Sequence, residues 1–161
     1  MPHAEPTRKK VKKGDFVTFD IGCFYDGYSS DITRTFVVGK ATPKQRKIYN
    51  LVLKANKKAI RTAKAGMDGY DLDKVARDVI KKAGYGPKFG HGLGHGLGME
   101  VHAFPRVSRL AHAKLKPNMV ITIEPGIYIK GWGGVRIEDD VRIKRGGCEV
   151  MTSFPKELIE I

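Results

Sequence analysis

The chain has 161 residues, of which 41% are hydrophobic and 29% are charged, which is enough apolar material for one core and excludes wholesale disorder. No apolar run approaches the roughly 18 to 20 residues of a membrane span, and the N-terminus does not resemble a signal peptide. Thirty Lys and Arg residues against 17 Asp and Glu residues give a formal net charge of +13, which suggests a polyanionic partner.

The first predicted element is a β-hairpin with strands at residues 16–24 and 28–38, joined at an Asp-Gly turn. In the register that this turn sets, Asp20 and Asp31 lie on the same face as diagonal neighbours. Two carboxylates on the interior side of a hairpin repel each other unless a proton or a cation lies between them. The pair therefore indicates either a cation site or two aspartates at a surface turn. The other face can pack under helices and carries Val17, Phe19, Ile21 and Cys23.

Two helices are predicted next. The first covers residues 43–64, with Thr42 as its N-cap and Pro43 in its first turn. The second begins at Asp71, the expected N-cap, and ends at Gly84. Apolar residues that should face the core recur at helical spacing: Ile48, Leu51, Val52, Ala55, Ala59, Ile60 and Ala63, then Leu72, Val75, Ala76, Val79, Ile80 and Ala83.

The positive charge is concentrated in two stretches. Five basic residues lie within residues 8–13, and nine lie within residues 40–64, where there is no carboxylate. In the first helix the lysines occupy the face opposite the apolar one, which is typical of a solvated surface. A nucleic-acid surface is the alternative, but the sequence has no zinc-finger, helix-turn-helix or aromatic RNA-recognition signature.

A segment rich in glycine and histidine covers residues 89–102 and precedes a polar connection over residues 106–118. His91 and His95 lie among glycines, each of which costs a helix about 1 kcal/mol relative to alanine, so a loop is favoured. One histidine is usually structural, but with His102 there are three in this stretch, which favours a metal or catalytic site.

Strands are predicted for the last third of the chain, at residues 119–124, 127–129, 135–143 and 149–152. Glu124 ends the first of them, and Glu138 shares a face of the third with Arg136 and Asp140. Each glutamate alone would usually be an exposed strand end, because burying an unpaired carboxylate is costly. With two helices, an antiparallel sheet and no internal repeat or linker, the predicted class is a single α+β domain over residues 1–161.

Four carboxylates (Asp20, Asp31, Glu124 and Glu138) and at least one imidazole can converge in such a fold. This set is too rich in oxygen for a structural zinc site and suits a pair of divalent ions such as Mn²⁺, Co²⁺, Zn²⁺ or Fe²⁺. Two ions about 3.5 to 4 Å apart would share a bridging hydroxide and polarise a carbonyl group. The predicted chemistry is hydrolysis of an amide bond.

The motifs resemble, in their order, those of the pita-bread metallopeptidases: Asp20-Ile21-Gly22, residues 30–36 (SDITRTF), His91-Gly-Leu-Gly-His95, residues 122–126 (TIEPG) and Arg136-Ile137-Glu138-Asp139. The doubled histidine and the last motif resemble the Xaa-Pro dipeptidase (prolidase) and aminopeptidase P branch more than the methionine aminopeptidases. The resemblance spans essentially the whole chain. It implies the pita-bread (creatinase/aminopeptidase) fold, a curved antiparallel sheet with helices on one face.

The same resemblance implies a dinuclear site and its substrates. Asp31 and Glu138 would bridge both ions, and Glu124 would also handle the proton of the attacking hydroxide. The full set of ligands would be Asp20, Asp31, His95, Glu124 and Glu138. His91 and His102 would bind substrate and stabilise the tetrahedral intermediate, Arg136 would lie near the substrate carboxylate, and His3 would line the pocket. Substrates would be peptides with proline after the scissile bond.

Two departures from the family pattern have consequences. Ala103 follows the third histidine, where the family usually has an acidic residue, so His102 would be held more loosely and activity reduced. The chain also begins just before the first metal-binding strand, so the first of two pseudo-symmetric halves would be incomplete. The sheet face behind Phe19 and Ile21 would then be partly uncovered, and a second copy or a partner that supplies the missing half would cover it.

Two other functions fit parts of the pattern. The first is an inactive or fragmentary pita-bread protein that binds RNA or a protein through its basic face. The second is a creatinase-like hydrolase of another C–N bond. The complete ligand set disfavours both. Cys23 and Cys148 are too few for a disulfide scaffold and fit a reducing compartment, so we expect a cytoplasmic enzyme.

Overall fold

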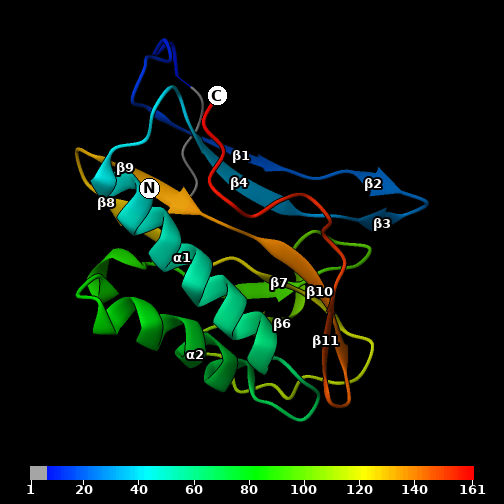
Figure 1. The fold of residues 1–161 in the computed structure, drawn as a ribbon. Coiled ribbons are helices and arrows are strands. Elements are labelled where there is room, and N and C mark those ends of the chain that lie inside the picture. The colour runs from blue at the N-terminus through cyan, green and yellow to red at the C-terminus, as the bar shows by residue number, and fades with distance from the viewer. Residues whose placement is uncertain (1–6) are drawn as a thin grey trace.

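A computed structural model describes residues 7–161 (Figure 1), and His3 lies outside the described residues. The helices are α1 (Pro43–Thr62) and α2 (Gly69–Lys82), followed by a short 3-10 helix at Gly86–Lys88. The strands are β1 (Phe16–Ile21), β2 (Phe24–Tyr25), β3 (Tyr28–Ser29), β4 (Ile32–Val37), β5 (Gly94–Gly96), β6 (Ala103–Val107), β7 (Val120–Ile123), β8 (Gly126–Ile129), β9 (Gly133–Arg136), β10 (Asp139–Lys144) and β11 (Gly147–Val150). None of the described helices is long and apolar enough to cross a membrane.

The larger sheet and the two helices form the core. Its strands lie in the order β11-β10-β7-β5-β6, and each neighbouring pair is antiparallel. α1 and α2 lie side by side on one side of these strands (Figure 1). Fully buried aliphatic side chains from both layers fill the space between them, among them Ile48, Leu72, Ile121, Ile123 and Val141. The predicted α+β class, with an antiparallel sheet and helices on one face, is confirmed.

The helix α1 begins where the sequence predicts. The Thr42 hydroxyl accepts a hydrogen bond from the Gln45 N–H, while the Gln45 side chain accepts one from the Thr42 N–H. This reciprocal capping box satisfies two backbone donors that a helix start would otherwise leave unpaired. Every apolar residue that was expected to face the core in this helix is buried or half-buried.

The helix α2 begins about one turn earlier than predicted. Its N-cap is Asp68, not Asp71, and the Asp68 carboxylate accepts a hydrogen bond from the Tyr70 N–H at 3.0 Å. The apolar periodicity did not indicate this earlier start, because Gly69 has no side chain and so adds no apolar position to the pattern. Glycine is required there, since a Cβ would lie 2.7 Å from the Arg106 carbonyl oxygen. At the other end Ala83 is exposed, so its predicted inward position is wrong.

The hairpin has the predicted register, with Asp20 opposite Thr33 and with the two tyrosines facing each other across the turn. Its ladder is interrupted between the β1–β4 and β2–β3 pairs. The Ser30 carbonyl oxygen would lie 2.1 Å from a Cβ at position 22, so only Gly22 permits this backbone approach beside Asp31.

The apolar face of the hairpin is uncovered in the described part of the chain. Phe19 and Ile21 are 49% and 61% exposed, and the Phe19 ring packs edge-on against the Phe36 ring, with centroids 5.4 Å apart. The expectation that this face packs under helices is wrong for the described residues, because α1 and α2 pack on the larger sheet. The uncovered surface expected behind Phe19 and Ile21 is present.

Two strand predictions also need correction. Residues 103–107 form β6, although the sequence predicts a polar connection from residue 106. Pro105 lacks an N–H donor, and the sheet tolerates it because β6 is an edge strand. The predicted strand at residues 135–143 is two strands, β9 and β10, because the Glu138 N–H donates to the Thr33 carbonyl of β4 at 3.1 Å. This break ends the simple alternation of side chains that the sequence predicts around Glu138.

Candidate metal centre

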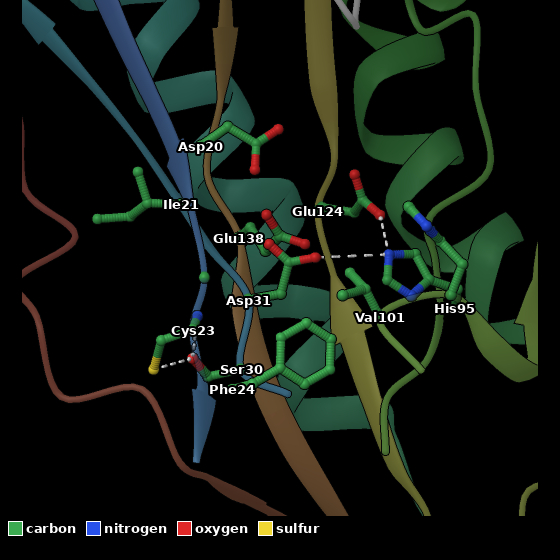
Figure 2. A pocket seen from close by; sticks show the side chains of 12 residues that line it. Asp20, Ile21, Cys23, Phe24, Ser30, Asp31, His95, Val101, Glu124 and Glu138 are labelled. Atoms are coloured by element: carbon green, nitrogen blue, oxygen red, sulfur yellow. Dashed lines mark hydrogen bonds and ion pairs between the residues drawn. The ribbon is translucent and has the colours of Figure 1, made fainter. Parts of the chain in front are cut away.

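Acidic and histidine side chains from the hairpin and from the larger sheet line one cavity of about 260 Å³ (Figure 2). The hairpin supplies Asp20 at the end of β1 and Asp31 just before β4. The remaining three are His95 of β5, Glu124 directly after β7 and Glu138 directly before β10. The five residues singled out in the sequence as ligands therefore line the same cavity.

The tightest group in this cavity is Asp31, His95 and Glu138, whose ligand atoms all lie within 4.8 Å of one another. His95 Nε2 is 3.8 Å from Asp31 Oδ2 and 3.4 Å from Glu124 Oε1. Asp20 stands apart from this group, because its carboxylate pairs with the Arg136 guanidinium and its side chain is 45% exposed.

His95 turns one particular nitrogen toward the carboxylates. Its Nδ1 lies 3.0 Å from the Gly96 carbonyl oxygen, which can only accept a hydrogen bond, so Nδ1 carries the proton. Nε2 then directs its lone pair toward Asp31 and Glu124 (Figure 2). The backbone is fixed as well, since the His95 N–H donates to Thr122 Oγ1 at 3.1 Å. Proteins orient imidazole ligands for metals in this way.

The Glu138 carboxylate and the Asp31 backbone are anchored where the hairpin meets β10. Thr33 Oγ1 donates to Glu138 Oε2 at 2.5 Å, and the Asp31 N–H donates to Asp140 Oδ2 at 3.0 Å. Glu124 is anchored separately, by the Thr122 hydroxyl at 3.2 Å and by its own N–H, which donates to the Leu93 carbonyl at 2.8 Å. The cluster is thus held by side chains and backbone from several strands.

Burial makes this cluster costly to ionise. It raises the pKa of Glu124 to about 8 and raises the pKa of Glu138 well above its ordinary value, with the charge of nearby carboxylates adding to the effect on Glu138. Burial and the neighbouring Asp20 raise the pKa of Asp31, and burial lowers the pKa of His95. Carboxylate oxygens and an imidazole lone pair are all acceptors, so protons or a cation must lie between them. Oxygen and imidazole ligands together fit Mn²⁺, Co²⁺, Zn²⁺ or Fe²⁺.

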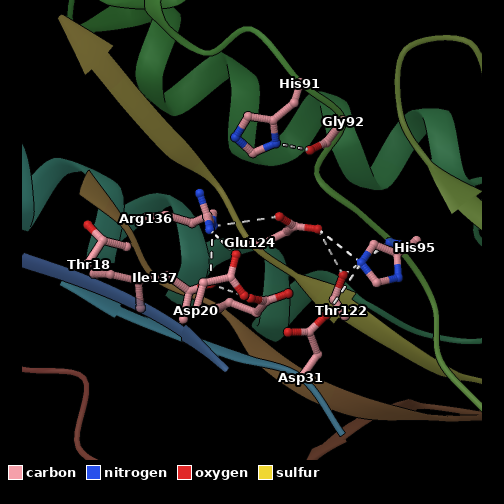
Figure 3. Close-up of polar contacts among 12 residues, drawn as sticks. Thr18, Asp20, Asp31, His91, Gly92, His95, Thr122, Glu124, Arg136 and Ile137 are labelled. Atoms are coloured by element: carbon pink, nitrogen blue, oxygen red, sulfur yellow. Dashed lines mark hydrogen bonds and ion pairs between the residues drawn. The ribbon is translucent and has the colours of Figure 1, made fainter. Parts of the chain in front are cut away.

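The other predicted site residues lie on two sides of the cluster. His102 lines the cavity, and its ring centroid is 4.4 Å from that of His95. His91 is not among the residues that line this cavity. Its Nδ1 is 2.8 Å from the Gly92 carbonyl oxygen and must donate to it (Figure 3). Its Nε2 therefore accepts from the Tyr128 hydroxyl at 3.0 Å.

Tyr128, which the sequence analysis missed, links His91 to the hairpin. Its hydroxyl oxygen accepts a hydrogen bond from Arg136 Nη1 at 3.0 Å, and the Arg136 guanidinium also pairs with Asp20. In the sequence Tyr128 looks like an ordinary aromatic residue of an apolar strand. The sequence feature that could have indicated its role is the glycine at position 134, which faces Tyr128 across the β8–β9 ladder. A Cβ at that position would lie 2.6 Å from the tyrosine ring, so glycine makes room for the ring.

The sequence analysis also missed the buried ion pair that joins the hairpin to β10. Arg34 Nη2 lies 2.9 Å from Asp139 Oδ1, and Arg34 donates to the Glu138 carbonyl oxygen as well. Asn56 of α1 donates to the other Asp139 oxygen at 3.0 Å. Arg34 and Asp139 look like ordinary polar strand residues in the sequence, because the partner that permits the burial of each is 105 residues away.

An α+β fold with a carboxylate and imidazole cluster in one cavity is the arrangement of a candidate metal-binding domain. The profile of metallopeptidase family M24 matches residues 1–145, so the chain belongs to that family. This confirms the family that the sequence motifs predict, and the structural relatives below confirm the pita-bread fold.

The chain is similar to several peptidases of known sequence or structure. It is 50% identical over 159 residues to a Xaa-Pro dipeptidase of Pyrococcus furiosus, covering 99% of this chain and 46% of that protein. Prolidase from Pyrococcus furiosus has a TM-score of 0.94 at 50% identity, over 96% of this chain and 46% of that one. X-Pro aminopeptidase from Thermotoga maritima has a TM-score of 0.97 at 42% identity, over 100% of this chain and 45% of that one. The chain therefore spans less than half the length of these relatives.

Proposed function

We propose that this chain is the catalytic domain, over residues 1–161, of a metal-dependent exopeptidase that hydrolyses the peptide bond before proline. The observation that carries the proposal is the meeting of Asp31, His95, Glu124 and Glu138 around one cavity, with Asp20 on its wall. Relatives named Xaa-Pro dipeptidase and X-Pro aminopeptidase support the substrate class. Xaa-Pro dipeptides and longer Xaa-Pro peptides are both candidate substrates.

In this proposal Asp20, Asp31, His95, Glu124 and Glu138 would hold two divalent ions, Mn²⁺, Co²⁺, Zn²⁺ or Fe²⁺. When bound, the ions supply Lewis acidity toward the substrate carbonyl and lower the pKa of a water molecule. The orientation of His95 supports the assignment, since its proton is on the nitrogen that faces away from the carboxylates.

The remaining proposed roles belong to the side chains around the cluster. Glu124 takes up and returns the proton of the attacking water, a role supported by its position 3.4 Å from His95 and by the Thr122 hydroxyl that orients it. His102, on the cavity wall, contacts the substrate carbonyl. Arg136 and His91, joined through the Tyr128 hydroxyl, bind the substrate from the side of Asp20.

The test is an activity assay with a Xaa-Pro dipeptide and a longer Xaa-Pro peptide, each with Mn²⁺, Co²⁺, Zn²⁺ or Fe²⁺ added. Glu138→Gln removes one ligand with little change of shape and should lower cleavage by more than about a hundredfold and weaken Co²⁺ binding in calorimetry. Glu149→Gln, on the surface of β11, is the matched control and should change neither. Cleavage of neither peptide with any of the metals, or equal loss in both variants, overturns the proposal.

We further propose that the exposed face of the hairpin is covered by a second copy of the chain or by a polypeptide that supplies the rest of the fold. Its support is the exposure of Phe19 and Ile21, which lie on the hairpin face that no described helix covers. Static light scattering across a dilution series should reveal association that Ile21→Asp abolishes. A monomer at all concentrations, with cooperative unfolding, would exclude the self-associating form.

A cytoplasmic location is the third part of the proposal. It rests on Cys23 and Cys148, which are free thiols in the structure, as a reducing compartment permits. Cell fractionation with thiol labelling should recover both cysteines in reduced form in the cytoplasmic fraction, and recovery in an oxidised secreted fraction would contradict it.

A second candidate function is a binding module for RNA. The observation in its favour is a row of basic residues on the outer side of α1 for which the described residues show no ion pair: Lys47, Lys54, Lys58 and Arg61. RNA binding that weakens steeply with salt and is unchanged by Glu138→Gln would support it, whereas salt-insensitive or absent binding would remove it.

A further inference from the structure

The helix α2 carries a buried ion pair next to the candidate centre. Arg77 donates through Nε and Nη2 to the two oxygens of Asp73, at 2.7 Å and 2.9 Å. The Asp73 side chain is 1% exposed and that of Arg77 is 13% exposed. Removing two charges from water is costly, so such a pair needs further hydrogen bonds to be stable.

Those further hydrogen bonds go to the loop that carries the histidines. Arg77 Nη1 donates to the Phe89 carbonyl at 2.8 Å, and Nη2 donates to the His91 carbonyl at 2.7 Å. Asp73 Oδ1 accepts from the Leu93 N–H at 3.0 Å. The guanidinium also lies over the Phe89 ring, 4.1 Å from its centroid. Three alternate residues of one loop are therefore held by one ion pair.

This loop has little rigidity of its own. Each held residue is followed by a glycine, at positions 90, 92 and 94, and glycine loses more conformational freedom on ordering than any other residue. The loop forms a strand only from Gly94 onward. Contacts from outside the loop must therefore fix its conformation, and the Asp73–Arg77 pair provides them from a rigid helix.

The held residues lead directly to the candidate centre. The Leu93 carbonyl accepts a hydrogen bond from the Glu124 N–H at 2.8 Å, so Leu93 bridges Asp73 and Glu124. The Phe89 ring packs edge-on against the His91 ring, with centroids 5.1 Å apart. We propose that Asp73 and Arg77 are positioning residues, which hold the His91 imidazole and the backbone beside Glu124 in the geometry that the site requires. The catalytic consequence rests on the proposed function, whereas the positioning itself does not.

The test compares two ion pairs on the same helix. Arg77→Lys keeps the positive charge beside Asp73 but loses the planar guanidinium that donates to the Phe89 and His91 carbonyl oxygens. The matched control is Asp78→Asn, which breaks the Lys74–Asp78 pair. This pair has the same spacing along α2 but is exposed, and among the described residues it shows no hydrogen bond to the loop. We expect Arg77→Lys to speed amide hydrogen exchange at Leu93 by at least about tenfold and to shift the ¹⁵N resonances of the His91 ring, with no such change in the control.

Three outcomes decide the proposal. Faster amide hydrogen exchange in the loop of Arg77→Lys, with shifted His91 ring resonances and unchanged exchange in α1, supports it. Amide exchange that speeds up equally in α1 overturns it, because the pair then stabilises the fold in general. Exchange rates and ring resonances identical to those of the control also overturn it, because the pair is then dispensable. If the unaltered chain cleaves Xaa-Pro peptides, Arg77→Lys should lower kcat by about tenfold with little change in KM. An inactive unaltered chain refutes the proposed function, and the exchange and resonance data still decide the positioning role.

Discussion

The two parts of the molecule that supply the candidate centre differ in how they are covered. The larger sheet lies beneath α1 and α2 and contributes Glu138, which is 2% exposed. The hairpin has no helix against it in the described chain and contributes Asp20, whose side chain is 45% exposed. Burial raises the pKa of Glu124 and Glu138 beside the covered sheet, and it also raises that of Asp31 in the hairpin. The exposed Asp20 differs from these three, because its carboxylate is held by an ion pair with Arg136.

The largest expected effect is a difference in stability between two isoleucine-to-alanine variants, one in each part. Ile123, in the covered sheet, is fully buried, whereas Ile21, in the hairpin, is 61% exposed. Ile123→Ala should lower the free energy of unfolding by about 2 to 5 kcal/mol, because it leaves a cavity in a packed core. Ile21→Ala should change it by less than about 0.5 kcal/mol. Urea denaturation of both variants measures the difference, and equal losses would show that the hairpin face is covered after all.

The second effect is a pH dependence that belongs to the covered part. The folded-state pKa of Glu124 is raised to about 8, above its ordinary value of 4.5, so the stability it contributes is present below pH 4.5 and is lost as the pH rises through 8. The metal-free protein should therefore lose stability between pH 5 and pH 8.5, by roughly 4 kcal/mol. Thermal unfolding across this range should show the loss, Glu124→Gln should reduce it, and added Mn²⁺ should reverse it. A flat profile in the metal-free protein would contradict this.

The smallest effect concerns the hydrogen bonds that join the two parts. Tyr128→Phe removes the hydroxyl between His91 and Arg136 but keeps the ring that packs beside Gly134. Peptide cleavage should fall by about tenfold, with a change in unfolding free energy of only about 1 kcal/mol. Tyr85→Phe, outside the site, is the control for loss of a tyrosine hydroxyl. A loss of stability without a loss of cleavage would make Tyr128 a packing residue.

Local signals in the sequence were sufficient for much of the fold and for the convergence of the site. The Asp-Gly turn set the register that places Asp20 opposite Thr33, and the Thr42 capping box set the start of α1. The five candidate ligands were located by motif, and all of them line the cavity.

What the sequence could not predict depends on distant partners. Pro105 argues against a strand until β6 is known to be an edge, and Gly69 gives no apolar signal at the start of α2. Tyr128 and Arg34 looked ordinary because their partners lie elsewhere in the chain. Hydrogen-bond partners across the fold leave no periodicity in the sequence, so only the structure reveals them.

The contacts between β4 and residues 136–140 have a consequence for how the protein assembles. Thr33, Arg34 and Thr35 are hydrogen-bonded to Glu138, Asp139 and Arg136, each more than a hundred positions later in the chain. Closing so long a loop is entropically unfavourable, so we expect the hairpin to dock late in folding. Until it docks, the two aspartates have no glutamates beside them. Capture of a divalent cation during refolding would then report the completion of folding rather than its beginning.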